Sequence, residues 1–128
     1  MSVRTGPLSE RTISAASGAA FILADSSGIS WAARRLGLDS PPVIPGIDFA
    51  FDLCGLAEIL SVPVYLLGGR PGVTDRAAKF INSHFPYLTI AGMRDGFFKE
   101  EDEEALIQDI IDSRSRLVLV ALGMPRQE

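Results

Sequence analysis

Short apolar runs alternate with longer amphipathic segments along most of the chain. Runs rich in Val, Leu, Ile and Ala predict buried strands at residues 20–24, 62–67, 88–91 and 117–122. Apolar positions at helical spacing predict helices over residues 29–36, 47–60, 73–85 and 100–112. Strands and helices follow one another in turn, which is typical of a parallel sheet with helices on its faces.

This alternation predicts an α/β fold, a Rossmann-like parallel sheet in three α/β/α layers. Gly37 is expected to cap the first helix, and the three prolines of residues 38–46 predict a loop. The segment 47–60 is apolar on more than one face, so we expect that helix to be substantially buried. Residues 1–18 predict a loose lead-in to one domain at residues 19–128. We expect this domain to be incomplete at its C-terminus, because it stops after a strand.

The composition argues against several classes of function. A formal net charge of −4 disfavours a large nucleic-acid surface. Cys54 is the only cysteine, which rules out an intramolecular disulfide and a cysteine-based zinc site. No apolar run approaches the roughly 20 residues that a membrane span needs. Residues 1–10 do not resemble a signal peptide, so we expect a cytoplasmic protein.

Glycine followed by arginine marks the ends of the last three predicted strands. The pairs are Gly69 with Arg70, Gly92 with Arg94, and Gly123 with Arg126. Ligands of open α/β sheets bind at the carboxyl ends of the strands, where these pairs are expected to meet. Glycine lets a phosphate approach the backbone, and arginine donates forked hydrogen bonds to phosphate oxygens. The pattern predicts a diphosphate site, although glycine and arginine are also common in loops that bind nothing.

Well-known nucleotide-binding motifs are missing from the sequence. The segment Gly68–Gly72 does not match the Gly-x-Gly-x-x-Gly fingerprint, and no P-loop is present, which disfavours NAD binding and ATP hydrolysis. Asp-x-Asp is also absent, so we expect no metal or other cofactor. Arginine and backbone dipoles would then stabilise a leaving diphosphate. The acidic run Glu100–Glu104 is expected to be a solvated helix start.

Four further side chains each allow two interpretations. Asp25 directly follows the first predicted strand and is either a general base or the N-cap of the next helix. Asp95 lies in an Asp-Gly turn, and turn chemistry alone explains it. His84 is expected to interact with the dipole at the end of its helix rather than to catalyse. Trp31 is expected in the core, with a pocket wall as the alternative.

Five segments carry a recognisable combination of motifs. They are Ala24–Arg34, Pro45–Asp48, Val64–Val73, Asp95–Phe98 and Leu122–Glu128. In this order they resemble the WecG/TagA/CpsF glycosyltransferases (glycosyltransferase family 26). Each motif is weak alone, but the shared order from about Ala19 to the last residue makes the resemblance specific. The chain is therefore similar to a truncated member of that family.

The resemblance implies inverting transfer of an N-acetylmannosamine-type sugar from a UDP-sugar to an undecaprenyl-diphosphate-linked acceptor. Products of the family feed bacterial teichoic acid and other cell-surface polysaccharides. The resemblance assigns the general base to Asp25 and a nucleotide-sugar contact to Gln127. Together with the loop pattern, it predicts substrate binding by Gly28, Gly46, Asp48, Gly68, Gly69, Arg70, Asp95, Gly96, Gly123, Pro125, Arg126 and Gln127. It also implies peripheral contact with the inner face of the plasma membrane in a full-length protein.

The chain departs from the family pattern at three positions. Ser26 stands where the family has glycine, Val43 where it usually has arginine, and Arg126 where it has lysine. These departures leave open a truncated or degenerate fragment that binds a nucleotide sugar without turning it over. A Rossmann-like oxidoreductase is a third hypothesis. Stabilisation by UDP or by NAD, with or without turnover, distinguishes the three.

Overall fold

The computed structural model describes Ser14 and residues 17–123, and these fall into two compact units. The first unit holds the described residues up to Pro45 together with Gly123. The second unit is Gly46–Leu122. The expected lead-in, residues 1–18, lies mostly outside the described residues.

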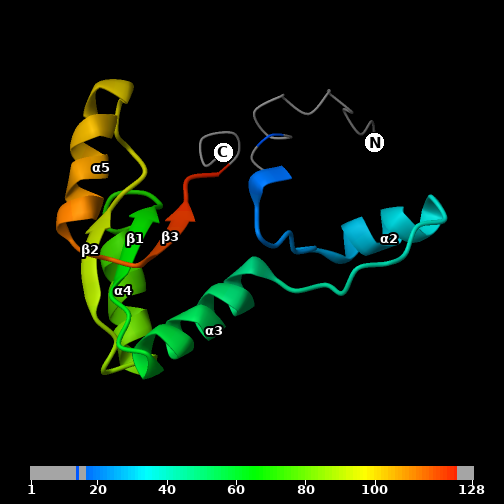
Figure 1. Cartoon of the computed structure of the whole chain (residues 1–128), viewed down its shortest axis with the longest axis horizontal. Helices are drawn as coiled ribbons and strands as arrows, with labels where there is room; N and C mark the ends of the chain where they lie inside the picture. The colour runs from blue at the N-terminus through cyan, green and yellow to red at the C-terminus, as the bar shows by residue number, and fades with distance from the viewer. Residues whose placement is uncertain (1–13, 15–16, 124–128) are drawn as a thin grey trace. The chain divides into compact units, whose positions relative to one another are not determined.

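The second unit contains a parallel sheet of three strands. They are β1 (Val64–Gly68), β2 (Ile90–Arg94) and β3 (Leu117–Ala121), in the order β2-β1-β3 (Figure 1). The predicted strands at 62–67, 88–91 and 117–122 are therefore confirmed, with bounds shifted by up to three residues. The pairing of β1 with β2 shifts register between Val64 and Tyr65.

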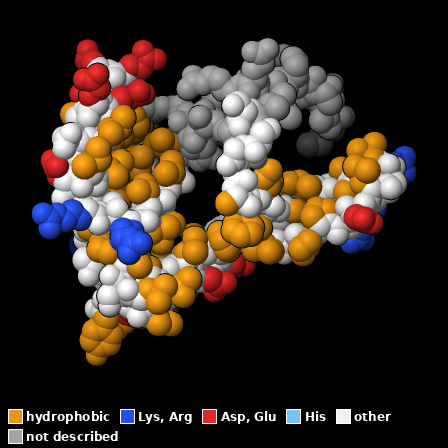
Figure 2. All heavy atoms as spheres, viewed as in Figure 1, with side chains coloured by type: hydrophobic (Ala, Val, Ile, Leu, Met, Phe, Trp, Pro, Cys, Tyr) orange, Lys and Arg blue, Asp and Glu red, His pale blue; other side chains and the backbone are white. Residues whose placement is uncertain are grey.

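Four helical segments connect and flank these strands. They are α3 (Gly46–Ile59), α4 (Val73–His84), the 3₁₀ turn η1 (Glu100–Asp102) and α5 (Glu103–Asp112). Pro86 follows the end of α4, as its missing amide proton requires. The acidic run forms η1 and the start of α5, and Figure 2 shows its carboxylates gathered at the surface. The expected solvated helix start is confirmed.

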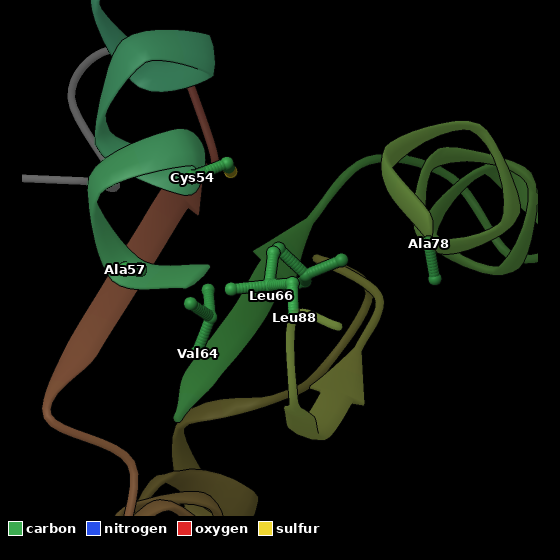
Figure 3. Packing of buried hydrophobic residues seen from close by; sticks show 6 residues of the cluster. All are labelled: Cys54, Ala57, Val64, Leu66, Ala78 and Leu88. Carbon is green, nitrogen blue, oxygen red and sulfur yellow. The ribbon is translucent and has the colours of Figure 1, made fainter. Parts of the chain in front are cut away.

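Side chains of β1 alternate between two apolar clusters on opposite faces of the sheet. Val64 and Leu66 pack with Cys54 and Ala57 of α3 and with Ala78 of α4 (Figure 3). The intervening residues of β1, Tyr65 and Leu67, pack on the other face with Leu106 of α5. Since a strand directs successive side chains to opposite faces, one strand serves both clusters. The predicted three-layer arrangement is confirmed.

Helix α3 is less buried than its sequence predicted. Only Cys54 and Ala57 are buried, on the face that packs against the sheet. Ile47 and Ile59 are 75% and 79% exposed, and orange side chains lie uncovered along α3 in Figure 2. The expectation of a substantially buried helix was wrong, because a helix that packs against one layer buries only one stripe of its surface.

In the first unit, helix α2 (Ser27–Arg35) is confirmed close to its predicted bounds. Gly37 has φ +71 and donates its amide to Arg34, while the Leu38 amide reaches the Ala33 carbonyl at 2.9 Å. These two bonds form a Schellman motif, which needs a residue in the left-handed conformation after the helix. The capping role predicted for Gly37 is confirmed.

The predicted strand at 20–24 does not form. Phe21 and Ile22 are 82% and 72% exposed, and only Ala24 pairs, in a single parallel bridge with Val43. The prediction was wrong because an apolar run becomes a strand only where a neighbouring strand pairs along its length. The bridge is supported by the Ile44 amide, which donates to the Ala24 carbonyl at 2.9 Å.

Two serine hydroxyl groups form hydrogen bonds between α2 and the loop that follows it. The buried Ser30 hydroxyl donates to the Pro41 carbonyl at 2.8 Å, and the Ser40 hydroxyl donates to the Ser30 carbonyl at 3.5 Å. The predicted loop at 38–46 is confirmed up to the start of α3 at Gly46. In the part of the chain that the structure describes, every helix falls short of the length and apolarity needed to cross a bilayer.

Candidate functional site

The strand order places a topological switch point beside β1. The chain runs from β1 to β2 on one side of the sheet and returns to β3 on the other side of β1. The connecting helices α4 and α5 lie on opposite faces of the sheet. Ligands of open α/β sheets bind where the chain diverges in this way, at the carboxyl ends of the strands. A ligand site is therefore expected at the loops that follow β1 and β3.

Backbone hydrogen bonds tie the loops after the three strands together. The Gly69 amide donates to the Ala121 carbonyl at 3.1 Å, which joins the loop after β1 to the end of β3. The Gly96 amide donates to the Gly69 carbonyl at 2.9 Å, which joins the loop after β2 to the loop after β1. Segments that are distant in sequence thus converge at one sheet edge, although Gly92, which was expected in the loop after its strand, lies inside β2.

At two glycines of this edge, an added Cβ would lie very close to neighbouring atoms. At Gly68, φ is +128, and a Cβ would lie 2.3 Å from the Ala121 carbonyl oxygen. At the buried Gly96, a Cβ would lie 2.9 Å from a methyl carbon of Leu122. At Gly68 the close atoms are backbone, so only glycine lets the end of β1 lie this near β3, whereas at Gly96 the close atom is the end of a flexible side chain.

The start of α4 belongs to the same edge. The buried Thr74 hydroxyl donates to the Gly68 carbonyl at 2.8 Å, and the Val73 amide donates to the Arg70 carbonyl at 2.9 Å. Arg70 itself is exposed, so its guanidinium is accessible next to an α-helix N-terminus. Sequence reasoning missed Thr74, although a threonine in the first turn after a glycine loop is a signal for such a bond.

A largely apolar groove of about 540 Å³ adjoins the glycine loops. Helices α3 and α4 provide two walls, including Phe51 and Phe80, and β1 and β3 form the floor. Three predicted site residues line it: Gly46, Gly68 and Gly69. The groove is thus a concave, apolar surface with backbone polar groups at one end, which is the usual make-up of a small-molecule site.

The other face of the sheet carries a buried phenol. Tyr65 donates its hydroxyl to a carboxylate oxygen of Asp109 on α5, and its ring occupies the space that a Cβ at Gly92 would need. Burial and the Asp109 carboxylate raise the pKa of Tyr65 to about 12, and Arg94 opposes the shift. Arg94 lies at the end of β2, half-buried, near this phenol. Sequence reasoning missed the pair, because Asp109 is 44 residues away.

Asp95 and Asp48 occupy different local settings in the second unit. One carboxylate oxygen of Asp95 accepts a hydrogen bond from the Phe97 amide at 2.8 Å, so the turn chemistry expected of Asp95 is confirmed. Asp48 is exposed in the first turn of α3, where the helix dipole favours an anion.

His84 ends α4 and packs its ring against Phe51 and Phe80, with Nδ1 3.0 Å from the Phe80 carbonyl oxygen. It lies at the opposite end of α4 from the glycine loops.

Asp25 belongs to the first unit, between the bridged Ala24 and the N-cap of α2. The N-cap is Ser26, whose backbone is extended, so Asp25 precedes the cap and is not itself the N-cap. Its side chain is exposed. Gly28 is the second residue of α2, and a Cβ there would make an ordinary contact 3.6 Å from the Ser26 hydroxyl. Sterics therefore do not require glycine at position 28.

Trp31 is not in the core. It is 66% exposed and lines a cleft of about 460 Å³ on α2. The expectation of a core tryptophan was wrong, and its alternative, a pocket wall, is confirmed. Among the described residues of the first unit, the 41–44 loop lies against α2 through the hydrogen bond from Ser30 to Pro41, and the indole stays exposed.

The last predicted site residues lie at the end of the chain. Gly123 has φ +75, with open space where a Cβ would project. Pro125, Arg126 and Gln127 lie outside the described residues. Among residues that are described, no three His, Cys, Asp or Glu side chains gather closely enough to hold a metal ion.

A family model, the glycosyl transferase WecG/TagA/CpsF family, matches residues 8–128. The chain belongs to the WecG/TagA/CpsF family. Membership in this glycosyltransferase family implies a nucleotide-sugar donor and a sugar acceptor. The match covers Asp25 in the first unit and the glycine loops in the second.

Proposed function

We propose that this WecG/TagA/CpsF protein transfers an N-acetylmannosamine-type sugar, with inversion, from a UDP-sugar to a polyprenyl-diphosphate-linked sugar. The acceptor would be presented at the inner face of the plasma membrane during cell-surface polysaccharide synthesis. The observation that carries the proposal is the convergence of the Gly68, Gly69 and Gly96 backbones at the switch point, in a chain of this family.

The donor is proposed to bind at the carboxyl edge of the sheet. Its diphosphate would accept hydrogen bonds from Arg70 and from backbone amides at the start of α4, which favour a negative charge. The uridine would lie along the apolar groove between α3 and α4, whose floor meets the glycine loops. By resemblance, Arg126 and Gln127 also contribute to binding of the donor.

Asp25 is proposed to act as the general base. Its carboxylate would take the proton from the acceptor hydroxyl as that oxygen attacks the anomeric carbon of the donor. The bond between that carbon and the diphosphate oxygen breaks, and UDP leaves with the electron pair. Attack opposite to the leaving group inverts the anomeric configuration. Arg70 and the helix amides stabilise the negative charge that develops on the leaving diphosphate.

The test is transfer by the Asp25→Asn variant. A UDP-sugar and a short polyprenyl-diphosphate N-acetylglucosamine serve as substrates. Loss of a general base is expected to lower the transfer rate by about 10²- to 10⁴-fold. Thermal stabilisation by UDP is expected to stay at the level of the original chain. Asp39→Asn, an exposed aspartate after α2, is the matched control and should transfer normally.

Three outcomes would contradict parts of this proposal. Unchanged transfer by Asp25→Asn removes Asp25 from the mechanism. Stabilisation by UDP without transfer by the original chain supports a nucleotide-sugar-binding protein instead. Stabilisation by NAD but not by UDP rejects the donor assignment altogether.

A further inference from the structure

The cleft on α2 combines an exposed aromatic ring with an arginine. Its lining residues are Ser27, Gly28, Ser30, Trp31, Arg34 and Val43. Trp31 and Arg34 are three residues apart in one helix, so their side chains are neighbours, with Cβ atoms about 5–6 Å apart. Val43 closes the opposite wall, where its bridge to Ala24 holds it.

The two side chains that define this cleft have no polar partner among the described residues. The Arg34 guanidinium makes no ion pair with any residue that the structure describes, and it is exposed. The indole N–H of Trp31 likewise makes no hydrogen bond within that part of the chain, and the ring is 66% exposed. Ser30, which also lines the cleft, donates its hydroxyl to the Pro41 carbonyl and so holds α2 to the following loop. An aromatic ring and a cation therefore line the same cleft.

This combination fits a sugar that carries a phosphate. The C–H face of a pyranose packs on an aromatic ring, and a guanidinium donates paired hydrogen bonds to phosphate oxygens. Asp25 is joined directly to Ala24, whose bridge partner Val43 lines the cleft. A hexose stacked on Trp31 would therefore lie close to the carboxylate that is proposed to deprotonate the acceptor.

We propose that the α2 cleft binds the sugar-phosphate end of the acceptor, a hexose with phosphate on its anomeric carbon. Trp31 stacks on the sugar ring, and Arg34 binds the phosphate. This assignment rests on the proposed function, since only that function supplies such an acceptor. The donor also contains a hexose with an anomeric phosphate, so the experiment has to separate the two sources.

Trp31 is the only tryptophan in the chain, so its fluorescence reports on this cleft alone. The full chain is titrated with N-acetylglucosamine 1-phosphate, which represents the acceptor end without its lipid. A saturable change in the emission of Trp31 is expected. Arg34→Gln is expected to weaken binding roughly tenfold or more, because a charge-assisted hydrogen bond is lost. Arg35→Gln is the matched control, since Arg35 is adjacent on α2 but does not line the cleft.

A variant that is expected to bind more tightly is also needed, because weaker binding by Arg34→Gln could result from a loss of folding. Val43→Arg adds a second cation to the opposite wall and is expected to tighten binding of N-acetylglucosamine 1-phosphate severalfold. The proposal is overturned if no saturable change occurs, or if Arg34→Gln and Arg35→Gln behave alike. It is also overturned if a UDP-sugar produces the same change and free UDP competes with it, because the cleft is then a donor site.

Failure of this proposal is distinguishable from failure of the proposed function. Stabilisation of the chain by UDP tests the donor site without involving Trp31. Suppose that UDP stabilises the chain and transfer occurs, but the emission of Trp31 does not change with the sugar phosphate. The proposed function is then supported and the assignment of the cleft is rejected.

Discussion

The second unit is held together by burial, whereas the described part of the first is held mainly by hydrogen bonds. Ten hydrophobic side chains are buried among the described residues, and Ala24 is the only one before Gly46. The glycine loops of the second unit extend directly from a strand packed on both faces. The position of Asp25 in the first unit depends on the Ala24 bridge and the fastened 41–44 loop.

The difference indicates how each unit responds to a substitution. A substitution at the glycine loops acts on the packed sheet and is expected to alter the free energy of unfolding of the whole second unit. A substitution near Asp25 is expected to act locally, because few buried contacts spread its effect.

The largest loss of stability is expected from Gly68→Ala. Its Cβ would meet the Ala121 backbone at 2.3 Å, and φ of +128 disfavours any side chain. Clash and backbone strain together are expected to lower the free energy of unfolding by about 3 kcal/mol or more. Urea denaturation followed by circular dichroism measures the change.

Gly72→Ala is the matched control for that variant. Gly72 also has a positive φ, of +78, but open space surrounds its missing Cβ. Only the conformational cost of about 1 kcal/mol is expected there. Equal losses for the two variants would show that the close approach of Gly68 to β3 contributes nothing to stability.

A smaller change in the free energy of unfolding is expected at alkaline pH, from ionisation of Tyr65. Its pKa is raised to about 12 in the fold, from 10 in an unfolded chain. Between these values the unfolded chain releases the proton first, so stability is complete below pH 10 and falls as pH rises toward 12. Raising the pKa from 10 to about 12 corresponds to about 2–3 kcal/mol of free energy of unfolding. Tyr65→Phe is expected to remove this part of the decline.

Urea denaturation at a series of pH values from 9 to 12 measures that decline. Tyr87→Phe is the control, because Tyr87 is 87% exposed and is the only other tyrosine. If the original chain and Tyr65→Phe lose stability in parallel over this range, the buried phenol is not the group that titrates.

The smallest effect is expected from Ser30→Ala in the first unit. The variant loses the hydrogen bond to the Pro41 carbonyl, which is expected to cost about 1 kcal/mol. Amide hydrogen exchange at Ile44, whose N–H donates to Ala24, should become faster. Exchange at Leu66 in the buried strand β1 should not change. Faster exchange at both sites would mean that the two units unfold together.

Much of the second unit was predictable from residue patterns. The alternation of strands and helices gave the parallel sheet, since buried strands and amphipathic helices have distinct periods. The glycines after the strands also pointed to loops that approach each other closely. Their partners could not be predicted, because the contact of Gly68 with Ala121 depends on strand order, which hydrophobic period does not encode.

In the first unit, residue patterns of the same kind predicted two features wrongly. Residues 20–24 are as apolar as a buried strand, yet only Ala24 pairs. Trp31 occupies a helical position that usually points to a core, yet it lines an open cleft. Apolar character states that a side chain can be buried, but only packing partners decide whether it is.

The sequence by itself determined the family, the α/β class and the kinds of side chain available for chemistry, because these depend on residue identity and local period. Tertiary structure alone decided which loops share the sheet edge, that Thr74 holds the Gly68 carbonyl, and that Tyr65 meets Asp109. Such contacts join segments through strand order and packing, and no local pattern in a single chain specifies them.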